Sequence, residues 1–272
     1  MEKVSIVSVI GMIFSMLIAI GMPMAAFLFW RKKTGASIKS FFQGAVTIFL
    51  SALVLERILH LIVFGVFGEA LTGNRLLYAL YGGAAAGIFE ETGRFLTMKY
   101  WMKKSLKKKN AIMYGIGHGG IESILLGGTA MMSNVLTAAM INAGSLESSL
   151  NSLDELSRSA ALEQVSALWT TKPYLFYLGG VERISAFFLQ ICFSYLVYRA
   201  VRYAKMEWYL SAVFLHFSVD AGSALLNGAI PTLLLEAVLL VLACVLLIFV
   251  YRTYQQEAVR TVSPQTLFEK YL

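Results

Sequence analysis

Apolar residues recur along the chain in seven long runs, which are separated by short connections rich in charged residues. The runs cover about residues 4–30, 39–66, 74–102, 110–142, 173–202, 207–228 and 231–253. Each is long enough for a transmembrane helix, which needs about 20 residues, and none alternates as a barrel strand does. The pattern predicts an all-α fold: a polytopic membrane helix bundle of about seven transmembrane helices, with one domain over residues 1–272.

Lysine and arginine are concentrated in every second connection and after the last run. The clusters are Arg31, Lys32, Lys33 and Lys39; Lys99, Lys103, Lys104, Lys107, Lys108 and Lys109; Arg199, Arg202 and Lys205; and Arg252 and Arg260. In a chain of seven spans, all four clusters fall on the same side of the membrane. By the positive-inside rule that side is the cytoplasm, so we expect an outside N-terminus and a cytoplasmic C-terminus.

The longest connection, about residues 144–172, lies on the outer side in this topology. Its leucines approximate helical spacing, with serine and glutamate between them. This pattern is typical of an amphipathic helix lying on the membrane surface. We expect it to cover the bundle; a lid that recognises substrate is the alternative.

The composition also indicates an integral membrane protein. Hydrophobic residues make up 58% of the chain and charged residues 14%, whereas soluble domains are about half apolar and about a quarter charged. The net charge of +7 does not indicate a nucleic-acid partner, because the cations gather at helix ends, where orientation in a membrane requires them. We expect the lipid bilayer as the surroundings and no nucleic acid.

Ionisable residues also lie inside the spans, where charged groups are costly and are retained mostly for a function. Three spans carry such residues four positions apart, a spacing that places both on one helix face. They are Glu90 and Arg94 with Glu91 between them, His118 and Glu122, and His216 and Asp220. At 1.5 Å per residue, the acids and imidazoles lie roughly 12–20 Å from the cytoplasmic ends of their helices, so they form one layer.

Two imidazoles with several carboxylates form a suitable site for a divalent cation, and a catalytic zinc keeps one position open for water. Zinc is the expected metal, with His118, Glu122, His216 and Asp220 as its ligands. Glu122 can equally orient His118 or pair with Arg94. Alternatively, the site acts without metal, with a carboxylate as general base on a water and the histidines holding the oxyanion. Both arrangements lead to hydrolysis.

The two adjacent acids have different expected roles, because neighbouring side chains on a helix point about 100° apart. Glu90 lies four residues before Arg94 and is the better placed of the two for an ion pair with it. This favours Glu91 as the base that activates water.

A second polar layer lies roughly 25–30 Å from the cytoplasmic ends. It contains Glu56 and Arg57 in one span and Glu182 and Arg183 in another. Because adjacent side chains on a helix do not face each other, we expect ion pairs between helices, Glu56 with Arg183 and Arg57 with Glu182. We interpret them as structural; a role in binding substrate is the alternative.

The polar motifs and their order resemble those of a known superfamily. Glu90-Glu91-x-x-Arg94, Tyr114-x-x-x-His118 and His216-x-x-x-Asp220 resemble the EExxR/K, FxxxH or FxxxE, and HxxxN/D motifs of the CAAX-protease and bacteriocin-processing superfamily and its PrsW relatives. More closely, the segments FEETGR, GHGGIE and HFSVDAG are similar to the YhfC family of intramembrane metalloproteases. The resemblance extends over essentially the whole chain.

The resemblance implies cleavage of a peptide bond in or near the membrane, in a membrane-protein or peptide substrate. It also implies a multi-pass protein of the cell membrane, namely the bacterial cytoplasmic membrane. Glu90 or Glu91 would activate water, while His118 and His216 with Asp220 would hold a metal, or the nucleophilic water and the oxyanion. The third motif ends in Asp220 rather than in the Asn of prenyl-protein proteases, which favours a cation and does not imply prenylated substrates.

The function predicted from these features is an intramembrane peptidase with a glutamate-activated water and a divalent metal. An ion- or proton-coupled transporter is the alternative, because intramembrane acids and histidines also form relays for protons and cations. Such transporters often contain inverted repeats, and the sequence shows no repeat. A third possibility is a scaffold in which the polar layer only locks the helices together.

Overall fold

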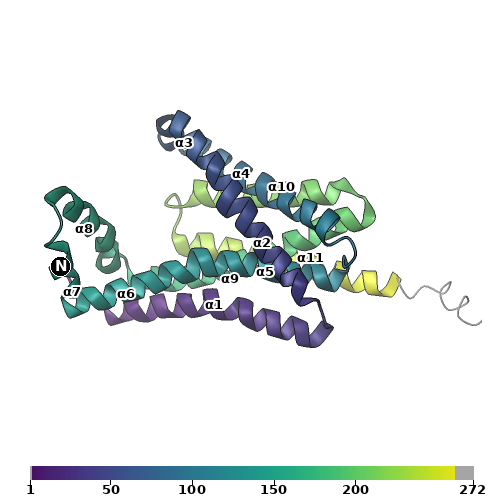
Figure 1. Ribbon diagram of the computed structural model, residues 1–272, viewed down its shortest axis with the longest axis horizontal. Helices are drawn as coiled ribbons and strands as arrows, with labels where there is room; N and C mark the ends of the chain where they lie inside the picture. Colours follow the sequence, from purple (N-terminus) through teal and green to yellow (C-terminus); the bar gives the residue numbers. More distant parts are fainter. Residues whose placement is uncertain (1, 261–272) are drawn as a thin grey trace, which may run out of the picture.

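The computed structural model describes residues 2–260, which form a helical bundle (Figure 1). Its α-helices are α1 (Ile6–Thr34), α2 (Ile38–Ile48), α3 (Arg57–Thr72), α4 (Arg75–Leu96), α5 (Lys108–Glu122), α6 (Thr129–Ala143), α7 (Ser145–Leu150), α8 (Glu155–Thr170), α9 (Pro173–Tyr203), α10 (Met206–Leu226) and α11 (Thr232–Arg260). Within residues 2–260 there is no strand, only an isolated bridge between Asn227 and Ile230. The all-α prediction is confirmed. The single domain over 1–272 stays a prediction, and residues 1 and 261–272 lie outside the described part.

Three of the predicted runs are continuous helices that contain a π-helical segment. The segments are Phe49–Glu56 between α2 and α3, Thr97–Trp101 after α4, and Ser123–Gly128 between α5 and α6. Each of the seven runs corresponds to one continuous helix. Two of these helices continue several residues beyond the predicted ends, to Thr72 and Arg260.

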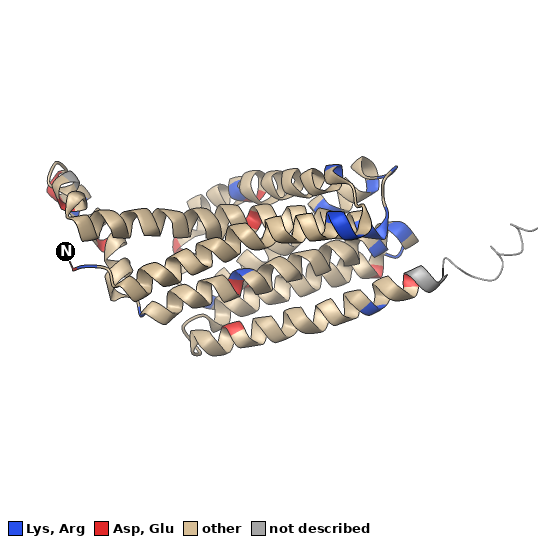
Figure 2. Cartoon of the chain, turned by 90° about the horizontal axis from the view of Figure 1, so that it is seen from below, with Lys and Arg blue, Asp and Glu red and all other residues tan. Residues whose placement is uncertain are grey.

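Six of the seven helices are long and apolar enough to cross a membrane. Within the described residues these are Ile6–Thr34, Ile38–Thr72, Lys108–Ala143, Pro173–Tyr203, Met206–Leu226 and Thr232–Glu257. The helix that begins at Arg75 is not among them, because it carries Glu90, Glu91 and Arg94. The count of seven spans and the orientation therefore stay predictions. Figure 2 shows lysine and arginine concentrated at one end of the bundle, as that orientation requires.

The outer surface of the bundle is apolar and its centre is formed by α9. In the most apolar stretch of α9, 72% of the residues are buried, compared with at most 33% in the other five candidate spans. Large apolar side chains such as Leu61, Phe214 and Val241 are more than 60% exposed. An apolar surface of this extent requires lipid around it, because soluble monomers rarely expose large contiguous apolar patches.

Close helix pairs in the bundle meet at glycines. A Cβ added to Gly44 of α2 would collide with the carbonyl oxygen of Tyr114 in α5, and one added to Gly117 of α5 would collide with that of Phe41 in α2. In lipid, where hydrophobicity does not drive helices together, small residues permit the close packing that holds them. This contact fixes α5, and with it the neighbouring His118, against α2.

The outer connection forms two short helices, α7 and α8, at one end of the bundle (Figure 1). Asp154 caps α8 by accepting a hydrogen bond from the backbone N–H of Ser157 at 2.9 Å, and the hydrogen bonds from Ser157 lower the pKa of the Asp154 carboxyl. Leu168 packs into a core with Met12, whereas Leu156 is 82% exposed. None of the described residues of this connection lines the central cavity.

Candidate active site

Arg94 lies at the centre of the polar layer, and its side chain is fully buried. Its guanidinium donates from Nη1 to Glu91 Oε1 at 2.5 Å and from Nη2 to Glu90 Oε2 at 3.2 Å. Nη2 also lies 2.7 Å from His118 Nε2 and contacts Gln190 Oε1. A single turn of α4 thus places both acids and links them to an imidazole from α5 and an amide from α9.

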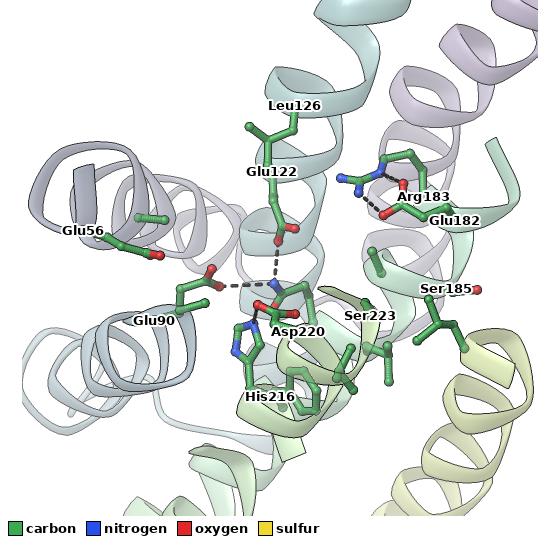
Figure 3. Close-up of a pocket in the computed structure, with 18 of the residues that line it drawn as sticks. Glu56, Glu90, Glu122, Leu126, Glu182, Arg183, Ser185, His216, Asp220 and Ser223 are labelled. Carbon is green, nitrogen blue, oxygen red and sulfur yellow. Dashed lines mark hydrogen bonds and ion pairs between the residues drawn. The ribbon is translucent and has the colours of Figure 1, made fainter. Parts of the chain in front are cut away.

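Glu90, His118 and Glu122 form a compact group in which one ligand atom of each residue lies within 4.8 Å of the others. His118 Nε2 is 3.0 Å from Glu90 Oε2. Gln190 lies between the two carboxylates, and its Nε2 donates to Glu90 Oε2 at 3.2 Å and to Glu122 Oε2 at 2.5 Å, contacts that are dashed in Figure 3. Because a guanidinium can only donate, the amide oxygen must face Arg94 and the amide NH₂ must face the carboxylates.

Glu91 and His216 form the second part of the site. His216 Nδ1 lies 2.7 Å from Glu91 Oε1, which links α10 to α4. Since the carboxylate accepts the Nδ1 proton, the other ring nitrogen, Nε2, is directed toward Asp220 Oδ2 at 3.6 Å, too far for a hydrogen bond. The Phe193 ring stacks on the imidazole at 5.0 Å between centroids and holds its plane.

Glu90, Glu122, Gln190 and His216 line a cavity of about 600 Å³ between α4, α9, α10, the helix that runs from α2 to α3 and the helix that runs from α5 to α6. Its polar lining residues are Glu56, Arg57, His60, Glu90, Glu122, Glu182, Arg183, Ser185, Gln190, His216, Asp220 and Ser223 (Figure 3). Glu91, Arg94 and His118 are fully buried and do not line it. A reactant in the cavity therefore meets Glu90 and His216 directly, while Glu91 and Arg94 hold these two in place from behind.

The three π-helical segments lie beside polar residues of the site. The first ends at Glu56, the second begins three residues after Arg94, and the third begins immediately after Glu122. A π-helical turn contains an extra residue and so changes the direction of the side chains that follow, and such turns are frequent at functional sites. The helices therefore depart from regular geometry where they approach the site.

The structure brings together the acids and histidines that the spacing placed in one layer. Glu90, His118 and Glu122 form one group, while His216 and Asp220 line the same cavity and are not part of that group. Sequence reasoning missed Gln190, which is 96% buried and contacts Arg94 and both cavity carboxylates. Its signal was weak, because it is an uncharged polar residue within an apolar run.

The prediction of ion pairs between helices in the second polar layer is wrong within the described residues. Arg183 pairs with the adjacent Glu182, with Nε 2.6 Å from Oε2, and Glu56 pairs with His60 at 3.2 Å. Arg57 makes no hydrogen bond or ion pair to another described residue. The physical reason is the cavity, whose wall contains all four residues, so the acids and arginines of the two helices face open space instead of each other. The long, flexible side chains of Glu182 and Arg183 therefore form an ion pair with each other.

The donor set fits a divalent cation. Glu90, Glu91 and Glu122 bring three carboxylates into the buried centre, and Arg94 provides one permanent positive charge. With the imidazoles neutral, two negative charges remain, and buried charges are stable only when they are compensated. Because a guanidinium can only donate, His118 Nε2 accepts from Arg94 and is unprotonated. Its lone pair would bind a cation in place of the Arg94 proton. The imidazole and carboxylate donors are those of catalytic zinc sites.

The fold and the site define a class, a multi-pass α-helical membrane protein with a buried centre of glutamate and histidine. Comparison with known proteins gives the family. The model of the YhfC intramembrane metalloprotease family matches residues 14–256, so the chain belongs to this family. It is also 38% identical over 208 residues to the "Uncharacterized membrane protein YhfC" of Bacillus subtilis (strain 168), covering 75% of this chain and 80% of that relative. No solved structure matches the chain.

Proposed function

We propose that the protein is an intramembrane peptidase that hydrolyses a peptide bond of a membrane-protein or peptide substrate in the central cavity, in the bacterial cytoplasmic membrane. The observation that carries this proposal is the group of Glu90, His118 and Glu122, in which the two glutamates line the cavity and His118 is buried behind them. His216 lines the same space. Family membership favours hydrolysis over the transporter alternative.

Glu90 is the base in this proposal, in place of Glu91. Glu90 lines the cavity, whereas Glu91 is fully buried behind it and is held by both Arg94 and His216. Glu90 Oε2 accepts hydrogen bonds from Arg94 and Gln190, and Oε1 makes no hydrogen bond to a described residue. A carboxylate that is held by one oxygen and free at the other can take a proton from a water on its free side.

His216 is the second cavity residue with a role in this proposal. Its Nδ1 bond to Glu91 fixes the ring and directs Nε2 toward the cavity and Asp220. When the ring is protonated at Nε2 as well, His216 can donate to the oxyanion that develops when water attacks the peptide carbonyl, and it can pass a proton to the leaving amine.

Glu90, through Oε2, together with His118 and Glu122 would hold a divalent cation, with zinc as the expected metal. When bound, the cation supplies Lewis-acid polarisation of the scissile carbonyl. The residues of the chain perform the remaining tasks: Gln190 spaces the two carboxylates, Arg94 holds Glu90, and Glu91 orients His216.

The test is cleavage of a pool of single-span membrane peptides by the purified protein in liposomes, followed by mass spectrometry. Glu90→Gln removes the base and should lower the rate at least about 100-fold, since general base catalysis contributes about 10²–10⁴. Glu236→Gln is the matched control, because Glu236 is another buried glutamate of the bundle that does not line the cavity. Cleavage that is equally fast in wild type and Glu90→Gln would contradict the proposal.

A further inference from the structure

A second cavity, of about 850 Å³, adjoins the first. Both are lined by Glu56, Arg57, His60, Ala86 and Asp220, so the cavity at Glu90 adjoins a cleft between α3, α4 and α10. We call this cleft the α3 groove. Its remaining lining includes the aromatic rings of Phe64, Tyr78 and Tyr81.

The α3 groove borders the lipid. No residue of α3 is buried, and Figure 1 shows α3 standing out from the bundle at the end of the helix that begins with α2. On the α4 wall, a Cβ added to Gly82 would meet no atom within 4 Å, so this position is open space. A chain that lies in the membrane beside α3 can therefore reach the groove without first crossing a helix.

The polar groups of the α3 groove suit a polypeptide backbone and not a lipid tail. His60 Nδ1 forms a hydrogen bond of 2.8 Å with the Tyr81 hydroxyl, and His60 Nε2 lies 3.2 Å from Glu56 Oε1. Arg57 has no ion-pair partner among the described residues. The carboxylate of Asp220 is 39% exposed where the two cavities join. A helix that unwinds in lipid must find new partners for its N–H and C=O groups, and these side chains supply both donors and acceptors.

The dimensions of the groove set the length of segment that it accepts. Glu90 and Tyr78 are separated by twelve residues on α4, which corresponds to about 18 Å at 1.5 Å per residue. An extended chain rises about 3.3 Å per residue, so this distance accommodates about five residues.

We propose that the α3 groove binds an extended segment of about five residues from a membrane-inserted polypeptide, which enters from the lipid beside α3 and leads to Glu90. Aromatic rings of the groove take up side chains, and Glu56, Arg57, His60 and Asp220 pair with the backbone. This inference deepens the proposed peptidase function by naming the substrate class and its route, but the binding it describes can be measured without cleavage.

The experiment measures binding by photocrosslinking in liposomes, with the inactive Glu90→Gln protein as background. Phe64 in the groove, or Phe29 on the lipid-facing surface of α1, is replaced by benzoylphenylalanine. The probe is a labelled polyleucine transmembrane peptide interrupted by Gly-Pro in its outer third, and an uninterrupted polyleucine peptide is the comparison. We expect the interrupted peptide to crosslink at Phe64 at least fivefold more than the uninterrupted peptide, and to show no such preference at Phe29.

Gly82→Trp fills the groove and should reduce the Phe64 crosslink to the yield of the uninterrupted peptide. Gly21→Trp is the control: Gly21 is exposed, an added Cβ there likewise meets no atom within 4 Å, and it lines neither polar cavity. Gly82→Leu, a smaller change to a better helix former, serves if the tryptophan variant does not fold.

Equal crosslinking of the two peptides at Phe64, no crosslinking there, or an undiminished yield in a folded Gly82 variant would overturn the inference. Cleavage of the same peptide by the wild-type protein is measured in parallel. Crosslinking without cleavage would support binding in the groove and contradict the peptidase function. Cleavage without crosslinking would support the peptidase function and contradict binding in the groove.

Discussion

At the scale of single residues, Gln190 determines how the two carboxylates of the cavity are spaced. Gln190→Met keeps a side chain of similar length but removes the hydrogen bonds to Arg94, Glu90 and Glu122. We expect kcat for peptide cleavage to fall about tenfold, or about 1.4 kcal/mol of transition-state stabilisation. KM should stay within about twofold, because the loss arises from misplaced carboxylates and not from lost substrate contacts.

The control for this prediction is Gln43→Met, since Gln43 is also buried in the bundle but does not line the cavity. That variant should keep kcat within about twofold of wild type. If Gln190→Met kept kcat and lost only thermal stability, as a purely structural glutamine would, the positioning role would be wrong.

The sequence identified most of the titratable residues of the site, because the spacing of four and a common depth are properties of a regular helix. It could not separate Glu90 from Glu91, since Arg94 contacts both, one at three residues and one at four. Which acid faces the cavity depends on how α4 is rotated in the bundle. Gln190 was missed because it carries no charge, although a buried amide needs hydrogen-bond partners as much as an acid does.

At the scale of the helices, the contact between α2 and α5 is set by two glycines, Gly44 and Gly117. Gly117→Ala places a methyl group against a backbone carbonyl that cannot move aside alone, so the helices must separate. We expect the free energy of unfolding to fall by about 1–3 kcal/mol, measured by denaturation in detergent. Gly21→Ala, in open space, should instead gain stability of up to about 1 kcal/mol from the better helix propensity of alanine. Equal effects at the two positions would contradict the packing argument.

The helix ends were predictable because apolar runs and charged connections mark them directly. The π-helical segments beside Glu56, Arg94 and Glu122 were not. A reading based on 3.6 residues per turn assumes a regular helix, and an extra residue in one turn leaves no trace in an apolar sequence. The expected pairing of Glu56 with Arg183 failed for a related reason: helical spacing gives the face of a residue but not the cavity in front of it.

At the scale of the whole molecule, the sequence predicts a helix bundle but not which helices are neighbours within it. In lipid the outer and inner faces of a helix are both apolar, so hydrophobicity does not show which face packs on which helix. The polar layer shows which faces pack together. Its acids and imidazoles, from α4, α5 and α10, can be neutralised only if these helices meet, as they do here. The cavity at this layer opens toward α3, so one arrangement of helices creates both the centre and its proposed route of access.

The central claim is that this space holds a divalent cation on Glu90, His118 and Glu122. The most direct test is the metal content of the purified protein, prepared without chelator and measured by mass spectrometry of the elements. We expect about one divalent metal ion per chain in the wild type, little in His118→Ala, and wild-type content in the matched control His60→Ala, because His60 lines the cavity but lies outside the ligand group. Equal metal content in wild type and His118→Ala, or no metal in the wild type, would contradict the claim.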